Sequence, residues 1–445
     1  MSIFKAYDIR GRYGVELDEA TAHRIGRWLP TIVAGPRVLI GRDARPSSPI
    51  LLEALARGLL EAGCQVDDAG LTSTPMVYFL TARHGYDLSI QITASHNPAA
   101  YNGFKVSRRD ARPVGYDTGL GQLEQAVASG TLPPPAAAPG RLRIVDRLDE
   151  FLAFLAPWRP DLDGLRLAAD FSDGLAARTF KPLFNDQLHY LADTPDGTFP
   201  SHPPNPLEPA AREPLIQCVT VGRLDGGMIF DGDADRVMFV DETGRFVRPD
   251  LMIALLAVPF LQRQPGATIL QDIRTSRGVT AFLRQAGANP VLWKVGHAFA
   301  KAKMRELGAV FGGELAGHYY FRDFFWCDSG ELAALVALGE LAAARRRGQR
   351  FSELLKPFDR LANTGELNYR VPRPADAVEA VRRGLIAERA PDLLLDFDGC
   401  RIEYPDWWAS IRPSNTEPYL RVIIEADSAD RLAERRACVE RLLGG

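Results

Sequence analysis

Three widely separated segments of the chain follow the same local plan. Each is a short apolar run that ends in an aspartate, at residues 38–43, 165–170 and 267–272, and helical patterns follow at 49–62 and 276–286. Strand, turn and helix repeated in this way predict α/β units whose functional loops lie at the carboxyl ends of strands. The three aspartates lie about 100 to 130 residues apart, a domain-sized interval. We therefore expect three α/β domains in series.

Breaks between these domains are visible in the composition. Leu132–Gly140 is a Pro/Ala run that cannot form regular structure, so it is expected to link domains. Further boundaries are expected near residues 244–249 and 357–365. The tail after them differs in character, because it combines strand patterns and amphipathic helices typical of a small α+β domain. The predicted domains are residues 1–140, 141–246, 247–361 and 362–445.

Composition and charge exclude several classes of protein. The 445 residues carry a net charge of −3, whereas a general nucleic-acid binder needs a basic face. The five cysteines are scattered, without the spacing of a zinc site or a disulfide framework. The longest apolar stretch, 251–261, is too short to span a membrane, and the amino terminus lacks the core of a signal peptide. We expect a cytoplasmic protein with neither nucleic-acid nor membrane partners.

The stretch Asp231–Arg236, which reads Asp-Gly-Asp-Ala-Asp-Arg, predicts a metal site. Its alternate carboxylates place three hard oxygen donors on one short loop, a set that favours Mg²⁺, or Mn²⁺ as a substitute. One alternative is an EF-hand, since Glu242 falls at the twelfth position. However, Arg236 stands where that loop needs glycine, and a strand pattern follows at 237–240. A solvated acidic turn is the other alternative.

A serine follows the strand-like segment 88–92, within the sequence Thr-Ala-Ser-His-Asn-Pro. Ser95 is a candidate nucleophile with His96 beside it, and Lys105 offers a cation to the same site. No Gly-x-Ser-x-Gly pattern surrounds the serine, so acyl transfer is not favoured. Taken alone, the motif is more typical of a plain polar turn.

Two further stretches offer groups that bind phosphates and sugars. Arg412–Pro418 combines a guanidinium, two hydroxyls and an amide, which suit phosphate oxygens, although a polar turn is the alternative. Lys294–His297 and Gly312–His318 contain glycine-flanked polar residues that suit a loop around a polyol. With the serine, the metal loop and the cations, these groups indicate phosphoryl transfer to a sugar phosphate.

With Lys5–Gly11 and Gly41–Arg45 added, these motifs resemble those of the α-D-phosphohexomutase family, which includes phosphomannomutases and phosphoglucomutases. They occur in the family's order over essentially the whole chain. The resemblance implies an α/β protein with four domains around a central cleft: three related α/β domains with mixed sheets and a smaller C-terminal α+β domain.

The resemblance also implies the reaction. It is the interconversion of hexose 1-phosphate and hexose 6-phosphate, with mannose as the first expectation and glucose as the second. The reaction passes through a phosphoserine enzyme and a hexose 1,6-bisphosphate, which is also the activator. A phosphoglucosamine mutase, a Mg²⁺-dependent sugar phosphatase and a non-catalytic sugar-phosphate sensor are the alternatives. The partner is a small-molecule sugar phosphate, and both a monomer and a homodimer are compatible with the sequence.

The site residues are carried over from the family's motifs, position by position. The catalytic group comprises Ser95, Arg10, His96, Lys105, Arg236 and His297. Substrate binding is assigned to Lys294, Glu314, His318, Arg412, Ser414, Asn415 and Thr416. The Mg²⁺ ligands are phosphorylated Ser95, Asp231, Asp233 and Asp235. Lys105 and His297 lead as general bases. Ala316 stands where the family's sugar loop usually has serine, which leaves the hexose preference open.

Overall fold

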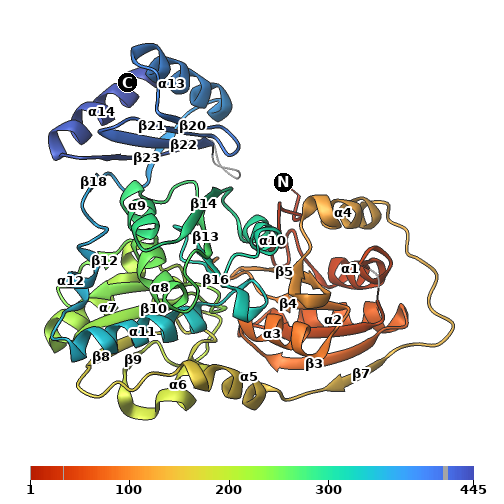
Figure 1. The fold of residues 1–445 in the computed structure, drawn as a ribbon. Helices are drawn as coiled ribbons and strands as arrows, with labels where there is room; N and C mark the ends of the chain where they lie inside the picture. The colour runs from red at the N-terminus through yellow and green to blue at the C-terminus, as the bar shows by residue number, and fades with distance from the viewer. Residues whose placement is uncertain (1, 34, 414–418, 445) are drawn as a thin grey trace.

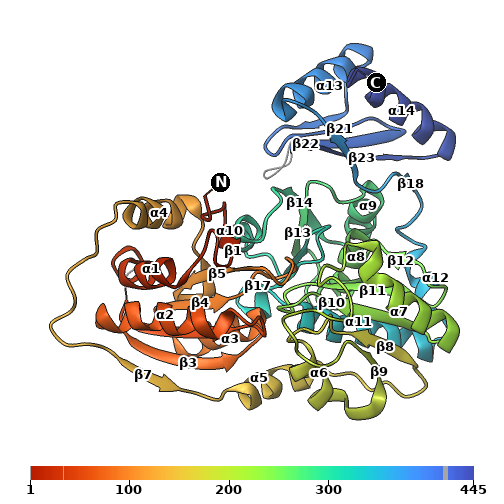
Figure 2. The ribbon, with the colours of Figure 1, turned by 180° about the vertical axis from the view of Figure 1, so that it is seen from behind.

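The computed structural model describes residues 2–33, 35–413 and 419–444. Its ribbon contains four units, each built on its own β-sheet (Figures 1 and 2). Three of the sheets mix parallel and antiparallel strands, and the fourth is antiparallel. The predicted architecture of three α/β domains and a smaller α+β domain is therefore confirmed.

The first unit has a seven-stranded sheet in the order β1-β5-β4-β2-β3-β7, with β6 paired to β5. Its strands are β1 (Ile9–Arg12), β2 (Arg37–Arg42), β3 (Gln65–Leu71), β4 (Leu88–Ile92), β5 (Tyr101–Arg108), β6 (Arg112–Pro113) and β7 (Arg141–Ile144). Its helices are α1 (Glu19–Ile32), α2 (Ser48–Glu61), α3 (Thr74–His84) and α4 (Leu120–Ala128). The Pro/Ala run 132–140 contains no helix or strand, as predicted. Because β7 pairs with β3, the sheet continues past residue 140, where we expected the domain to end. The added strand covers the otherwise open edge of β3.

The second and third units share one strand order. The second contains β8 (Leu167–Asp170), β9 (His189–Leu191), β10 (Gly226–Phe230), β11 (Val237–Asp241) and β12 (Phe246–Val247), with α5 (Leu148–Leu155), α6 (Ala177–Phe184) and α7 (Pro209–Gly222). The third contains β13 (Thr268–Asp272), β14 (Asn289–Trp293), β15 (Phe311–Gly313), β16 (Tyr319–Phe321) and β17 (Cys327–Asp328). Its helices are α8 (Pro249–Arg263), α9 (Arg277–Gln285), α10 (His297–Leu307), α11 (Gly330–Arg346) and α12 (Phe351–Leu355).

The three α/β units share four strands in the same order. The sheet orders β12-β11-β10-β8-β9 and β17-β16-β15-β13-β14 match each other and match β5-β4-β2-β3 of the first unit. In every unit a parallel strand (β4, β10 or β15) turns back into an antiparallel neighbour (β5, β11 or β16). The serine, the three aspartates and the sugar-loop residues predicted from the sequence lie in these three equivalent turns.

The fourth unit is an antiparallel sheet in the order β18-β23-β22-β21-β20, with β19 also on β23. Its elements are β18 (Ala362–Asn363), β19 (Leu367–Arg370), β20 (Leu393–Leu395), β21 (Cys400–Glu403), β22 (Trp407–Pro413), β23 (Tyr419–Ala426), α13 (Pro374–Glu388) and α14 (Ala429–Leu442). Both views place this unit against the third, near β13, β14 and α9 (Figures 1 and 2).

Local capping and a shared core hold the three α/β units together. Ser73 caps the N-terminus of helix α3 with a side chain that accepts the Met76 N–H, and the helix ends before a left-handed Gly85. Its Phe79 contacts Phe151 of α5, with ring centroids 5.5 Å apart, and Phe151 contacts Phe324 of the third unit.

No helix among the described residues combines the length and the apolar character needed to cross a membrane.

Candidate active site

Ser95 lies in the turn between β4 and β5, directly beyond a fully buried strand. Its φ of +51° falls in the left-handed region that residues other than glycine seldom adopt. Its N–H donates to Thr93 Oγ1 at 2.9 Å, and its side chain is buried. A strained backbone of this kind persists only where surrounding contacts hold it in place.

Arg45 supplies those contacts. Its fully buried guanidinium donates to the backbone carbonyls of four residues in this turn, Ser95, Asn97, Pro98 and Tyr101. Asp43, directly after β2, accepts from Arg45 Nε at 3.0 Å and from Thr93 Oγ1 at 2.7 Å. Sequence reasoning noticed both residues in a motif but gave them no role. In the structure they are the framework of the serine turn.

The three aspartates lie in the equivalent turn of the second unit, between β10 and β11. Asp231, Asp233 and Asp235 are completely buried, and one oxygen of each lies within 4.8 Å of the others. Ser95 Oγ donates to Asp231 Oδ2 at 2.7 Å. A Cβ on Gly232 would lie 3.0 Å from the Ser95 carbonyl oxygen, so a larger residue would crowd the place where the two turns meet.

Two cations partly neutralise this acidic cluster. Lys105 Nζ lies 2.6 Å from Asp233 Oδ2 and also pairs with Asp235. Arg236 Nε donates to Asp231 Oδ2 at 2.9 Å. Burial opposes the charge of Lys105, but the neighbouring aspartates outweigh it and raise the pKa of this amine. Burial raises the pKa of Asp231 to about 7. The pKa values of Lys105 and Asp231 are thus strongly shifted, as those of residues in functional sites often are.

The cluster also has acceptor capacity that the described residues leave unused. Asp233 Oδ1 and Asp235 Oδ1 are buried and have no hydrogen-bond partner within the described parts of the chain. Buried carboxylate oxygens without a partner are costly, and a divalent cation would satisfy them. Since all the donors are oxygens, the residues present fit Mg²⁺.

Arg10 and His96 contact the serine turn with their side chains. Arg10 Nη1 donates to Asn97 Oδ1 at 2.7 Å and also pairs with Asp8. His96 Nδ1 lies 3.3 Å from Ser95 Oγ, and burial lowers the pKa of this imidazole well below its usual value. The His96 imidazole therefore borders the serine hydroxyl, and the Arg10 guanidinium is attached to the same turn through Asn97.

Two further histidines meet beside the aspartates. The rings of His297 and His318 stack with centroids 5.9 Å apart. His318 Nδ1 lies 2.8 Å from Asp328 Oδ2 and 3.8 Å from Asp235 Oδ1, and these acids raise the pKa of His318 although burial opposes them. Lys301 Nζ lies 2.6 Å from the other Asp328 oxygen. Sequence reasoning missed Asp328 and Lys301, because no motif marks them and only the meeting of β17 with α10 brings them here.

The predicted sugar loop is the equivalent turn of the third unit. Glu314 is buried, its Oε1 accepts the Gly296 N–H at 2.7 Å, and burial raises the pKa of this carboxyl. The stretch containing Lys294 therefore lies against the stretch containing Glu314. An antiparallel bridge between Arg236 and His318 joins the turn that contains the three aspartates to the turn that contains Glu314. The three equivalent turns thus converge on one place.

Comparison with known proteins agrees with this convergence. The family described as phosphoglucomutase/phosphomannomutase matches through its alpha/beta/alpha domains I, II and III and its C-terminal domain, over residues 1–132, 149–244, 248–361 and 366–442. The chain belongs to the α-D-phosphohexomutase family. It is accordingly an isomerase, a phosphohexomutase.

Individual relatives cover nearly the whole length. The phosphomannomutase of Salmonella montevideo is 38% identical over 454 residues, spanning 98% of this chain and 97% of that protein. A protein named phosphohexose mutases from Xanthomonas campestris is 38% identical over 443 residues, with 97% of each chain covered. The crystal structure of a phosphoglucomutase/phosphomannomutase family protein from Burkholderia thailandensis superposes with a TM-score of 0.88 at 33% identity, covering 99% and 96% of the two chains.

Arg412, one of the residues predicted to bind phosphate in this phosphohexomutase, lies on the fourth unit. Arg412, at the end of β22, is 5% exposed, and its Nη2 donates to Asp398 Oδ1 at 2.9 Å. Arg412 and Ser95 thus stand on different units, and the Arg412 partner belongs to its own unit. Ser414, Asn415 and Thr416 lie outside the described residues.

The EF-hand alternative does not apply to this phosphohexomutase. The acidic turn is followed by β11, a strand, and not by the helix that an EF-hand needs. Glu242, which would be the bidentate ligand, instead accepts from the backbone N–H and the hydroxyl of Ser352 at 3.0 and 2.5 Å. A metal ion bound by the aspartates would consequently receive no ligand from Glu242.

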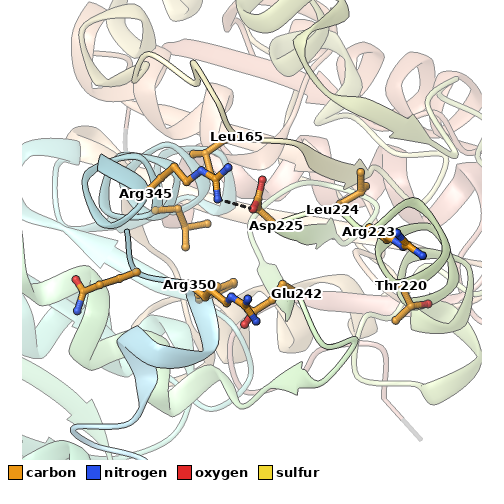
Figure 3. Close-up of a pocket in the computed structure, with 11 residues that line it drawn as sticks. Leu165, Thr220, Arg223, Leu224, Asp225, Glu242, Arg345 and Arg350 are labelled. Atoms are coloured by element: carbon orange, nitrogen blue, oxygen red, sulfur yellow. Dashed lines mark ion pairs between the residues drawn. The ribbon is translucent and has the colours of Figure 1, made fainter. Parts of the chain in front are cut away.

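A cavity of about 450 Å³ lies away from these turns, beside the end of α7 and the α11–α12 junction (Figure 3). The close-up shows Arg345 reaching toward Asp225, with 3.5 Å between Nη1 and Oδ1. None of the residues that line it belongs to the predicted site. The candidate active site of the phosphohexomutase is therefore identified from the side chains that meet in the three turns and not from this cavity.

Proposed function

We propose that this phosphohexomutase acts preferentially on mannose phosphates, with glucose phosphates as second substrates, and that Ser95 carries the transferred phosphoryl group. The observation that carries the proposal is the 2.7 Å hydrogen bond from Ser95 Oγ to Asp231 Oδ2. It puts a hydroxyl in contact with a buried oxygen cluster that also binds a lysine and an arginine. The name phosphomannomutase of a relative at 38% identity supports mannose.

The proposed reaction has two phosphoryl transfers. The P–O bond to Ser95 breaks as the free sugar hydroxyl forms a new P–O bond, and the hydroxyl proton passes to a base. The product of this step is a hexose 1,6-bisphosphate. After the sugar turns around, the other phosphoryl group returns to Ser95 and leaves the isomeric monophosphate. Free hexose 1,6-bisphosphate can phosphorylate resting enzyme by the same step, so it is the expected activator.

The phosphoserine environment divides into metal ligands and phosphoryl-binding cations. Asp231, Asp233 and Asp235, with an oxygen of phosphorylated Ser95, would hold Mg²⁺, which when bound supplies charge that stabilises the departing serine oxygen. Lys105 and Arg236 contact the aspartates, and Arg10 and His96 contact the serine turn, so we propose that these four residues bind the phosphoryl oxygens. Preorganised cations of this kind stabilise charge that develops during transfer.

For the proton transfer, we propose His297 in preference to Lys105. Lys105 is paired with two aspartates that raise the pKa of its amine, whereas burial lowers the pKa of His297 well below its usual value. His318, whose Nδ1 lies 2.8 Å from Asp328 Oδ2, stacks against the His297 ring and so limits its movement.

Substrate binding is shared between the third and fourth units. Glu314 is proposed to accept hydrogen bonds from sugar hydroxyls, with Lys294 on the neighbouring turn contributing positive charge. Arg412 is proposed to hold the phosphate that is not reacting, because guanidinium groups bind phosphate through two parallel hydrogen bonds. Ser414, Asn415 and Thr416 complete this clamp in the proposal.

The proposal is tested by assaying purified protein with mannose 1-phosphate, glucose 1-phosphate and glucosamine 1-phosphate, with and without a hexose 1,6-bisphosphate. We expect the highest kcat/KM for mannose 1-phosphate and stimulation by the bisphosphate. An Ala316→Ser variant adds the hydroxyl usual in the family, so the mannose-to-glucose ratio of kcat/KM should change by no more than about tenfold, the worth of one hydrogen bond. A highest kcat/KM for glucosamine 1-phosphate would overturn the substrate assignment.

The division of the chain is also part of the proposal. We keep the boundaries near residues 246 and 361 and move the first past β7, to about residue 145. Both a monomer and a homodimer are compatible with a site assembled within one chain, and light scattering during gel filtration distinguishes them.

A further inference from the structure

The carboxylate of Asp398 makes two hydrogen bonds that join the third and fourth units. Oδ1 accepts from Arg412 Nη2 at 2.9 Å, and Oδ2 accepts the Val295 N–H at 2.8 Å. Val295 lies in the turn between β14 and α10, next to Lys294. Asp398 therefore offers the proposed phosphate clamp an anionic partner while tying it to the turn that carries a candidate substrate cation.

The loop that carries Asp398 is built to sit against Arg412. Gly399 has a φ of +68°, and a Cβ there would lie 2.8 Å from the Arg412 Cα and 2.3 Å from the Ile411 carbonyl oxygen. On the other side, Phe397 contacts Trp293 of β14, with ring centroids 5.5 Å apart. The carboxylate is thus held from both sides at the guanidinium.

A second group of contacts attaches the same two units elsewhere. Arg401 Nη1 donates to the carbonyl oxygens of Ile273 and Thr275 at 2.8 and 2.6 Å, and Arg277 Nη1 donates to the Tyr404 carbonyl at 2.6 Å. None of these residues is a candidate for substrate binding. The fourth unit consequently keeps a firm attachment to the third even when the Asp398 contacts are broken.

We propose that Asp398 occupies Arg412 in the ligand-free enzyme and gives it up to the substrate's non-reacting phosphate, so that phosphate binding releases the fourth unit from Val295. This proposal rests on the proposed role of Arg412. A phosphate dianion carries more charge than a carboxylate and offers three oxygens, so it displaces the carboxylate from the guanidinium. The Asp398 contact then opens while the Arg401 contacts act as the pivot.

The test replaces Asp398 with asparagine, which keeps the shape and one acceptor oxygen but removes the charge that competes with phosphate. We expect Asp398→Asn to lower KM for mannose 1-phosphate about three- to tenfold, since a charge-assisted bond is replaced by a neutral one. Calorimetric titration with inorganic phosphate should show a matching gain in affinity. Small-angle scattering should show a larger radius of gyration for the ligand-free variant than for wild type.

Asp396→Asn is the matched control, because it removes an exposed charge two residues away and is expected to leave all three measurements unchanged. Asp398→Ser removes the charge with a different side chain and should also lower KM and raise phosphate affinity. This second variant separates the loss of charge from any misfolding that is specific to Asp398→Asn. A raised KM, or unchanged phosphate affinity and scattering, overturns the proposal. The phosphate titration and the scattering do not require turnover, so they test Asp398 even if the substrate assignment fails.

Discussion

Ser95 Oγ and Asp231 Oδ2 lie 2.7 Å apart although 136 positions separate them in the chain. They occupy topologically equivalent turns of two related units, the β4–β5 turn and the β10–β11 turn. The hydroxyl proposed to carry the phosphoryl group and the carboxylate proposed to bind the metal thus occupy equivalent structural positions in two units.

Replacing Ser95 with alanine should abolish both phosphorylation and turnover, because the proposed cycle uses this hydroxyl as the phosphoryl carrier. Intact-mass measurement after incubation with a hexose 1,6-bisphosphate should show one added phosphoryl group on wild type and none on the variant. Near-wild-type turnover by Ser95→Ala would exclude the phosphoserine mechanism.

Changing Asp233 to asparagine should lower kcat by roughly 10²-fold or more, because it removes charge that binds both Lys105 and the proposed Mg²⁺. Chelator should likewise inactivate wild type, and added Mg²⁺ should restore it. Asp117→Asn, which changes an exposed acid, is the matched control and should behave as wild type. Full activity of wild type in chelator would rule out the metal role.

Substituting Arg45 with lysine should lower kcat by about 10²-fold, the cost of misplacing a reacting group by about 1 Å. A lysine ammonium cannot reproduce the planar fork that reaches four carbonyls of the Ser95 turn. Arg57→Lys, an exposed change on α2, is the control. Equal kcat values for the two variants would mean that Arg45 does not position Ser95.

Glu331 predicts a pH dependence of stability. This fully buried carboxyl accepts from Ser73 of the first unit and Thr179 of the second, and burial raises its pKa to about 8. Between the unfolded value near 4.5 and about 8, the folded protein binds more protons than the unfolded one. The free energy of unfolding therefore falls as pH rises through this window, by at most about 1.4 kcal/mol per pH unit for this group.

Glu331→Gln should flatten that dependence, so the variant should gain thermal stability relative to wild type as pH rises from 5 toward 8. Thermal melts at a series of pH values measure the effect, with the exposed Glu53→Gln as control. If wild type and Glu331→Gln lose stability in parallel over this range, Glu331 is ionised in the folded protein and the prediction is wrong.

Much of the local structure and chemistry was predictable because the information is close together in the chain. The strands at 38–43 and 267–272 and the helix at 49–62 correspond to β2, β13 and α2. Apolar periodicity and turn residues act over a few positions, so the sequence pattern alone indicates these strands and this helix. The Asp231–Arg236 loop similarly holds three carboxylates within five positions, which is enough to predict an oxygen site for a divalent cation.

The sequence by itself thus determined the α/β units, the small final domain and the oxygen-rich loop. Only the tertiary structure decided that the three functional turns are equivalent and converge, that Asp328 and Lys301 stand behind His318, and that Asp398 holds Arg412. These contacts join residues that are far apart or carry no motif, and they form because separate sheets bury their faces against one another. Packing of that kind depends on the whole folded surface, which no short stretch of sequence encodes.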